Sequence, residues 1–317
     1  MSNVSNDRVG RIPPDHQVHW DQVYAQAKVP EIWSIPKSVF LPIWESGITG
    51  KGVRIAVHDT GFVGHAQLPQ PVFERNLTTS NSSDVSDRNG HGTHCAGSAL
   101  GRDGVGVAPE ADLLVLKVLG DRGFGQTQWI NRAREIAAKE GADIISESLG
   151  SPEGDRSDID SIEGAYDQGV LLNVAAAGNA GFRGRNTIGY PGRFLQTFCI
   201  GSYRRDGQIS SFSSGGRELD AASPGEQIVS CSHRGGFIAM SGTSMATPHF
   251  AGLMALIIQK RRMAGFADLQ GVDAWRQFFQ TAGFFEDAGQ PGRDVRFGLG
   301  KPLIEKILDW LKEPDWI

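Results

Sequence analysis

Three short stretches of the sequence carry the side chains that nucleophilic catalysis of acyl transfer requires. Asp59 directly follows an apolar run, His91 stands in a Gly-His-Gly-Thr-His stretch, and Ser244 stands in Gly-Thr-Ser-Met-Ala-Thr-Pro. A serine hydroxyl is a poor nucleophile until a base removes its proton, and a third group must hold the base in the correct tautomer. An acid, an imidazole and a hydroxyl therefore form a candidate catalytic set.

Each of the three stretches also has an ordinary structural interpretation. Asp-Thr-Gly is common in turns, and Gly-Thr-Ser before an apolar run is typical of a helix start. His91 and His94 have a spacing on one predicted helix that could hold a metal ion. We interpret His94 as a hydrogen-bonded structural residue, because the catalytic set uses His91 without any metal.

Strand-like and helix-like runs alternate after residue 50 and place the three stretches at strand ends and helix starts. Such alternation predicts a three-layer α/β fold, in which helices cover both faces of a mainly parallel central sheet. Ligands of these folds bind at the carboxyl ends of the strands. The first 50 residues hold five prolines and read as irregular. The expected strands are 53–58, 113–119, 143–147, 170–176, 198–202 and 227–231, and the expected helices are 91–100, 127–140, 157–168 and 244–262.

Charge and composition exclude several classes of partner. The net charge of the 317-residue chain is −5 and no Lys/Arg cluster forms a basic stripe, so we expect no nucleic-acid partner. No apolar run is long enough to span a bilayer, so we expect no membrane partner. The three cysteines are widely spaced, and the sequence opens without the apolar segment of a secretory signal. We expect a cytoplasmic protein, either a monomer or a homodimer.

Further motifs extend the pattern over most of the chain. In order they are Thr-Gly-Lys-Gly-Val from residue 49, Gly-Val-Ala-Pro from 106, Ala-Ala-Ala-Gly-Asn from 175, Gly-Tyr-Pro-Gly from 189 and Phe-Gly-Leu-Gly from 297. With the three catalytic stretches, they resemble the subtilisin family of serine peptidases. The resemblance implies a subtilisin-like peptidase domain over residues 47–317, preceded by an N-terminal extension over residues 1–46.

The resemblance also implies an activity and a role for each catalytic residue. The protein would be a serine endopeptidase that cleaves an extended peptide or protein through an acyl-enzyme. Ser244 would be the nucleophile, His91 the general base and then acid, and Asp59 the carboxylate that orients the imidazole. Asn179 would donate its side-chain amide to the oxyanion, together with the backbone N–H of Ser244.

The same resemblance outlines a substrate cleft. One edge segment would pair with the peptide as an added strand, an opposite edge would form one wall of the S1 pocket, and a third segment would supply the other wall and the floor. Small residues in that pocket imply a preference for large apolar P1 side chains. Leu119, Thr127 and Ile130 resemble the lining of the S4 pocket. The three segments are, in order, Gly123, Phe124 and Gly125; Ser148, Leu149 and Gly150; and Ala176, Ala177, Gly178 and Gly189.

The sequence departs from the family at its tight calcium site. The family carries an acidic residue shortly after Asp-(Thr/Ser)-Gly, where this chain has His-Ala-Gln-Leu at 65–68, and it has a longer loop than residues 99–106. Hard cations need several oxygen ligands. We therefore expect the tight site to be absent and no cofactor to be required, with a weak calcium site elsewhere as the open alternative.

The N-terminal extension contains Arg-Ile-Pro-Pro at residues 11–14. This stretch is similar in place and type to the motif that intracellular subtilisins lay across their cleft. A proline after the scissile position resists cleavage, because its ring lacks an N–H and restricts the preceding residue. We expect the extension to inhibit the enzyme, and a disordered tail is the alternative.

Three further residues depart from the usual pattern. Cys95 follows the start of the His91 helix, as in some members that resemble proteinase K, and we expect it to be buried. His58 and Glu147 stand where the family usually has apolar residues. Neighbouring residues of a strand point to opposite faces, so His58 cannot be the imidazole that Asp59 orients. We expect His58 to pair with Glu147 behind the site; separate backbone or water partners are the alternative.

Sequence features disfavour three other functions. The complete catalytic set disfavours a catalytically silent or tightly regulated binding protein on the same fold. The glycines of residues 101–106 precede a strand instead of opening a helix, which disfavours a dinucleotide-binding enzyme. Ser244 does not lie in Gly-x-Ser-x-Gly, and the order of the acid, the imidazole and the hydroxyl differs from that of an α/β-hydrolase.

Overall fold

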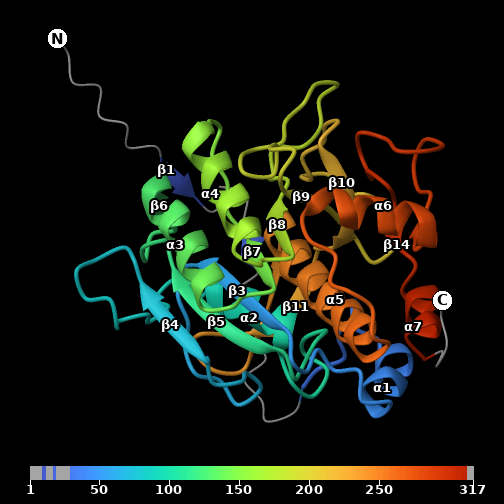
Figure 1. The fold of residues 1–317 in the computed structure, drawn as a ribbon, viewed down its shortest axis with the longest axis horizontal. Helices are drawn as coiled ribbons and strands as arrows, with labels where there is room; N and C mark the ends of the chain where they lie inside the picture. The colour runs from blue at the N-terminus through green and yellow to red at the C-terminus, as the bar shows by residue number, and fades with distance from the viewer. Residues whose placement is uncertain (1–8, 12–16, 19–28, 313–317) are drawn as a thin grey trace.

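A central sheet of seven strands organises the protein (Figure 1). The computed structural model describes residues 9–11, 17–18 and 29–312. The strands lie in the order β10-β9-β8-β7-β3-β5-β4, and every neighbouring pair is parallel. Their bounds are β3 (Arg54–Asp59), β4 (Phe73–Asn76), β5 (Asp112–Lys117), β7 (Ile144–Glu147), β8 (Leu172–Ala176), β9 (Phe198–Tyr203) and β10 (Leu219–Pro224).

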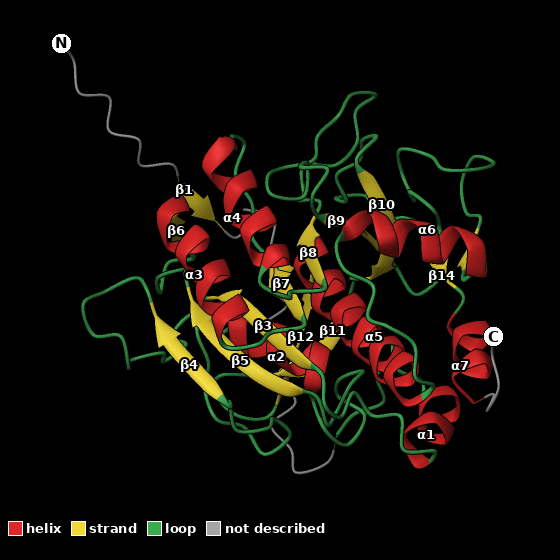
Figure 2. Cartoon of the chain, in the orientation of Figure 1, coloured by secondary structure: helices red, strands yellow, loops and turns green. Residues whose placement is uncertain are grey.

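Helices cover both faces of this sheet (Figure 2). One face packs against α2 (His91–Leu100) and α5 (Thr243–Met263), and the other packs against α3 (Thr127–Lys139) and α4 (Arg156–Asp167). The expected three-layer α/β fold is confirmed. No helix in the described part of the chain is both long and apolar enough to cross a bilayer.

The central strands are apolar runs because both of their faces are buried. In β3, every residue after Arg54 is buried, and β7 is buried throughout. The charged or titratable residues of these runs, namely His58, Asp59 and Glu147, lie at the carboxyl ends of their strands. The register pairs His58 with Glu147, so these two side chains stand side by side on one face of the sheet.

The described residues form three smaller sheets outside the central one. β11 (Ile228–Cys231) and β12 (Phe237–Ser241) form an antiparallel pair that β2 (Gln17–Val18) joins at β12. The expected strand at 227–231 is therefore present, but it belongs to this separate sheet. β1 (Val9–Arg11) pairs with β6 (Phe124–Gln126), and β13 (Phe285–Glu286) pairs with β14 (Lys301–Pro302).

The expectation that the first 50 residues are irregular is wrong for α1 (Lys37–Glu45). This helix contains Pro42, which cannot donate a helical hydrogen bond. The burial of Phe40 and Ile43 in the core compensates for that loss. α1 packs against α7 (Ile304–Lys312) from the other end of the sequence, as Figure 1 shows, and α6 (Val272–Ala282) completes this side of the molecule.

Candidate active site

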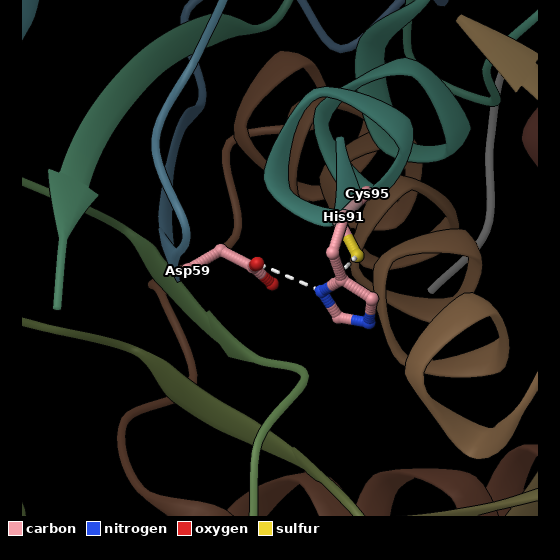
Figure 3. Close-up of side chains that lie close together, drawn as sticks. All are labelled: Asp59, His91 and Cys95. Carbon is pink, nitrogen blue, oxygen red and sulfur yellow. Dashed lines mark hydrogen bonds and ion pairs between the residues drawn. The ribbon is translucent and has the colours of Figure 1, made fainter. Parts of the chain in front are cut away.

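Asp59 and His91 form a hydrogen-bonded pair at the carboxyl end of the central sheet (Figure 3). Asp59 is the last residue of β3, and His91 is the first residue of α2. The distance from His91 Nδ1 to Asp59 Oδ1 is 2.7 Å, and the backbone N–H of Thr60 donates to the same oxygen at 2.7 Å. Both side chains are almost completely buried. The imidazole therefore carries its proton on Nδ1, which leaves Nε2 as the basic nitrogen.

A second acid, Asp87, ties the strand end to the helix start. Its carboxylate accepts hydrogen bonds from the backbone N–H of Gly90 at 2.7 Å and of Thr93 at 2.8 Å, and from the hydroxyl of Thr60 at 2.8 Å. The Thr60 hydroxyl in turn accepts from the N–H of Gly92 at 2.9 Å. Burial alone would raise the pKa of Asp87, but the hydrogen bonds outweigh burial and lower it. Sequence reasoning missed this residue, although an acid just before a helix start is a capping signal.

A glycine allows α2 to approach β3 this closely. A Cβ on Gly92 would lie 2.3 Å from the backbone oxygen of Gly61 and 3.2 Å from the Cβ of Asp59. Contacts this short with backbone cannot relax by moving a side chain. Gly92 therefore contributes to the short distance between the carboxylate and the imidazole.

Ser244 lies at the start of α5, where it contacts the end of β7. Its Oγ donates to the backbone oxygen of Ser148 at 3.3 Å, and the hydroxyl of Ser148 donates to the backbone oxygen of Ser244 at 2.8 Å. Ser244 is the second residue of a helix that is buried over most of its length. The backbone N–H groups of a helix start favour negative charge nearby.

Cys95 connects the imidazole with the serine. Its Sγ lies 3.8 Å from Nδ1 of His91 and 3.4 Å from the backbone oxygen of Ser244. Figure 3 shows its sulfur beside the imidazole on the same helix. The side chain is fully buried, as expected, and burial, followed by the charge of Asp59, raises the pKa of the thiol. Cys95 is therefore a neutral thiol at neutral pH.

The ligand atoms of Asp59, His91 and Cys95 all lie within 4.8 Å of one another, a grouping that could hold a metal ion. The carboxylate and Nδ1 of this group already bond to each other, and the thiol is protonated. A metal ion there would have to break that bond and deprotonate the thiol.

Asn179 is oriented by the residue next to Ser244. Its Oδ1 accepts hydrogen bonds from both the backbone N–H and the hydroxyl of Thr243, at 2.9 and 3.0 Å. The hydroxyl of Thr243 also accepts from the N–H of Gly178 at 3.1 Å. Because these bonds occupy the amide oxygen, the NH₂ group of Asn179 points away from Thr243 and toward Gly242. A Cβ on Gly242 would lie 3.2 Å from Asn179 Nδ2.

The segments expected to form the S1 pocket lie together. The backbones of Ser151 and Tyr190 exchange two hydrogen bonds of 2.8 Å, and the N–H of Gly189 donates to the oxygen of Ala177 at 3.0 Å. A Cβ on Gly189 would lie 3.2 Å from the oxygen of Ser151. The segments 148–150 and 176–178 and Gly189 therefore surround one small region.

A small pocket lies between the start of α3 and this region. Thr127 and Ile130 line it, and so do Leu149 and Gly150 of the predicted S1 wall. Leu119 does not line it, because it is fully buried beneath Gly125, where a Cβ would lie 2.9 Å from Leu119 Cδ2. Three charged residues that sequence reasoning did not anticipate, Arg134, Glu153 and Asp158, contribute to the lining.

The edge segment expected to bind the peptide is β6, and β1 pairs with it in antiparallel register. Val9 is opposite Gln126, Gly10 is opposite Gly125, and Arg11 is opposite Phe124. The second strand of the extension, β2, pairs with β12. Gln17 is opposite Ser241, which lies three residues before Ser244. Two described strands of the extension thus pair with β6 and with β12. Ile12, Pro13 and Pro14 of the predicted inhibitory motif lie outside the described residues.

His94 is a buried structural residue, as expected. Its Nε2 lies 2.9 Å from the backbone oxygen of Ile228. Burial lowers the pKa of His94 to about 3, so the ring is neutral. A neutral ring that donates to a carbonyl fits this structural role.

The expected contact between His58 and Glu147 is present, at 3.1 Å between Nδ1 and Oε1. Arg134 of α3 also bonds the Glu147 carboxylate. Sequence reasoning missed Arg134. The available signal was an arginine within the helix at 127–140 on the face that a buried carboxylate would need.

Comparison with known proteins agrees with this geometry. A model of the subtilase family matches residues 50–300. The chain is 36% identical over 279 residues to an intracellular serine protease of Paenibacillus polymyxa, with 84% of each chain covered. It is 38% identical over 227 residues to the major intracellular serine protease of Bacillus subtilis, covering 68% of this chain and 71% of the relative. It is 36% identical over 257 residues to subtilisin E of the same species, covering 80% of this chain and 66% of the relative. The chain therefore belongs to the subtilase family and is a subtilisin-like serine endopeptidase.

Proposed function

We propose that the protein cleaves peptide bonds through an acyl-enzyme on Ser244, with His91 and Asp59 as its catalytic partners. The observation that carries the proposal is the buried hydrogen bond of 2.7 Å between Asp59 and His91. It holds the imidazole in the tautomer whose Nε2 can accept a proton. Ser244 supplies that proton as its Oγ attacks the scissile carbonyl, and His91 then returns it to the leaving amine.

Asn179 and the backbone N–H of Ser244 stabilise the negative charge on the tetrahedral intermediate. The two hydrogen bonds from Thr243 to Asn179 Oδ1 support this role, because they fix the amide before substrate binds. Donors that are already oriented do not reorganise during the reaction. The helix start beneath Ser244 adds a favourable electrostatic contribution.

The S1 pocket accepts large apolar P1 side chains. Ala176, Ala177 and Gly178 on one wall and Gly189 at the floor are small, and they leave space between the two walls. The bonds between Ser151 and Tyr190 and between Gly189 and Ala177 hold these segments in place. None of the predicted wall and floor residues is charged, which favours burial of an apolar side chain against them.

The N-terminal extension, residues 1–46, inhibits the enzyme by occupying its substrate edge. Its strand β1 already pairs with β6, and a peptide substrate would use the same backbone groups of β6. Residues 32–43 of the extension instead contribute Ile32, Ile35, Phe40 and Ile43 to the core. The inhibitory part is therefore the region before residue 29.

The enzyme requires no metal ion and acts in the cytoplasm. The backbone bond of 2.7 Å from Arg102 N–H to the oxygen of Gln67 joins the two stretches that would otherwise hold the family's tight calcium ion. Two relatives are named intracellular proteases, which supports the location.

A peptide-library assay tests the proposed activity. The parent chain and Ser244→Ala are compared in parallel, each with and without residues 1–17. The expected result is cleavage after large apolar residues by the parent alone. Equal cleavage by Ser244→Ala would contradict the proposed nucleophile, and preferred cleavage after charged residues would contradict the proposed pocket.

A further inference from the structure

A buried cluster of three ionisable residues lies on the face of the sheet opposite the catalytic helices. Glu147 Oε1 accepts from His58 Nδ1 at 3.1 Å and from Arg134 Nε at 2.9 Å, and Glu147 Oε2 accepts from Arg134 Nη2 at 3.0 Å. The exposed fraction is 1% or less for each of the three residues. This is a two-pronged arginine–carboxylate pair with an imidazole as the third member.

The charges within the cluster balance. Burial would raise the pKa of Glu147, but the positive charge of Arg134 and the hydrogen bond from His58 lower it to about 2. Burial lowers the pKa of His58, and its bond with Glu147 offsets only part of that effect. Glu147 is therefore an anion, Arg134 its cation, and His58 a neutral donor.

The cluster joins the elements that carry the catalytic groups. His58 directly precedes Asp59, and Glu147 directly precedes Ser148, whose backbone and hydroxyl both bond to Ser244. The His58–Glu147 bond therefore links the ends of β3 and β7 sideways, one residue before each catalytic contact.

Arg134 extends the cluster to both rims of the cleft. It lies in α3, which directly follows the substrate edge β6. Its Nη1 donates to Asn131 of the same helix at 2.8 Å and to Ser161 of α4 at 2.9 Å. The segment that leads into α4 starts at the S1 wall, so one guanidinium contacts a helix from each rim.

We propose that His58, Arg134 and Glu147 are positioning residues for the peptidase reaction. They fix Asp59 and Ser148 relative to each other, and through these two the distance between the imidazole and the serine. The claim rests on the proposed function, because it concerns the same catalytic groups. Burying a salt bridge in place of apolar residues often gains no stability, so stability alone does not account for the cluster. A small displacement of catalytic groups, in contrast, lowers turnover steeply.

The test separates stability from turnover. One variant, His58→Leu/Arg134→Met/Glu147→Met, replaces the whole cluster with apolar side chains. Asp158, which lies 3.9 Å from Arg134, keeps its hydrogen bond from the backbone N–H of Asp155 in this variant. A second variant, Glu147→Gln, keeps the volume and removes the charge. Asp143→Asn is the matched control, because Asp143 precedes β7 at its other end and pairs with Arg262 away from the site. Thermal melting, kcat and KM are measured for each variant on one short peptide substrate.

The expected result for the triple variant is a melting temperature close to that of the parent, with kcat about 10- to 100-fold lower and KM within about twofold. Asp143→Asn should lower the melting temperature and leave kcat unchanged. If the triple variant does not fold, Glu147→Gln tests the proposal instead. Its kcat, measured well below its melting temperature, should be lower than that of the parent. The kcat of Asp143→Asn should equal that of the parent.

A triple variant with the parent's kcat, or one in which only KM rises, would overturn the positioning role. So would a loss of kcat in Glu147→Gln that Asp143→Asn matches. A parent chain that hydrolyses no peptide, even without residues 1–17, would overturn both this role and the proposed function. An active parent with an equally active triple variant would overturn the positioning role alone.

Discussion

Asp59 and His58 are neighbours in β3, yet they bond to partners on opposite faces of the sheet. Asp59 bonds to His91 of α2 at 2.7 Å, and His58 bonds to Glu147 beneath α3 at 3.1 Å. The alternation of side chains along a strand makes this separation necessary. The adjacent acid and imidazole in the sequence therefore belong to two different clusters, and the backbone of β3 joins them.

Asn179→Ala should lower kcat about 10²- to 10³-fold with little change in KM. This is the typical cost of removing one oxyanion-hole donor, as in subtilisin. The interaction forms mainly in the transition state, so substrate binding is affected less. Steady-state kinetics on a peptide substrate measure both constants. A rise in KM with unchanged kcat would contradict the role assigned to Asn179.

Removing residues 1–17 should raise kcat/KM on a small peptide substrate. The deletion frees the edge of β6 that β1 occupies, so substrate no longer competes with a tethered strand. A peptide with the sequence of residues 1–17, added to the truncated enzyme, should inhibit it competitively. Unchanged kcat/KM after the deletion would contradict the inhibitory role.

The protein should lose stability as the pH falls below about 6.5. Burial lowers the pKa of His94 to about 3 and that of His249 to about 4, from an ordinary value of 6.5. Below pH 6.5 the unfolded chain binds protons that the folded chain does not. The free energy of unfolding therefore falls as the pH is lowered. Each histidine contributes a slope of about 1.4 kcal/mol per pH unit, which ends near its own folded pKa.

Denaturant unfolding at pH 7, 6 and 5 measures this slope. His249→Gln should reduce it by about 1.4 kcal/mol per pH unit, because one of the proton-linked groups is removed. The same slope in the parent and in His249→Gln would show that His249 titrates normally in the folded protein.

Treatment with a calcium chelator should leave both activity and the melting temperature unchanged. The stretches that correspond to the family's tight calcium site are joined directly by the Arg102–Gln67 backbone hydrogen bond. A bound ion that stabilises the folded state would raise the melting temperature, and the rise grows with the logarithm of the ion concentration relative to its Kd. A large fall in the melting temperature with chelator, restored by added calcium, would contradict this prediction.

The sequence predicted the elements whose signals are local. The predicted bounds of α2 agree with the structure at both ends. Glycines flank this helix on both sides, and its last residue is Leu100. α1 was missed because its proline is a local signal for a loop, whereas its stability comes from the burial of Phe40 and Ile43 among distant residues. Propensity is a weak guide where tertiary packing decides.

The same distinction applies to the site. Asp59, His91, Ser244 and Asn179 lie in recognisable motifs, so they could be named in advance. The cluster around Glu147 was only half predicted. The family resemblance placed the two strands side by side and so suggested His58 as a partner. Arg134 reaches Glu147 from a helix, and its position on the apolar face of that helix indicated burial but not which strand it contacts.

The central claim is that Ser244 is a nucleophile activated by His91, and covalent labelling tests it most directly. A fluorophosphonate probe reacts with an activated serine and reports the modified residue by peptide mass spectrometry. The account predicts a single adduct on Ser244, its absence in Ser244→Ala, and labelling slowed by orders of magnitude in His91→Ala, which still has the hydroxyl but lacks the base. An adduct on another residue, or equally fast labelling of His91→Ala, would contradict it.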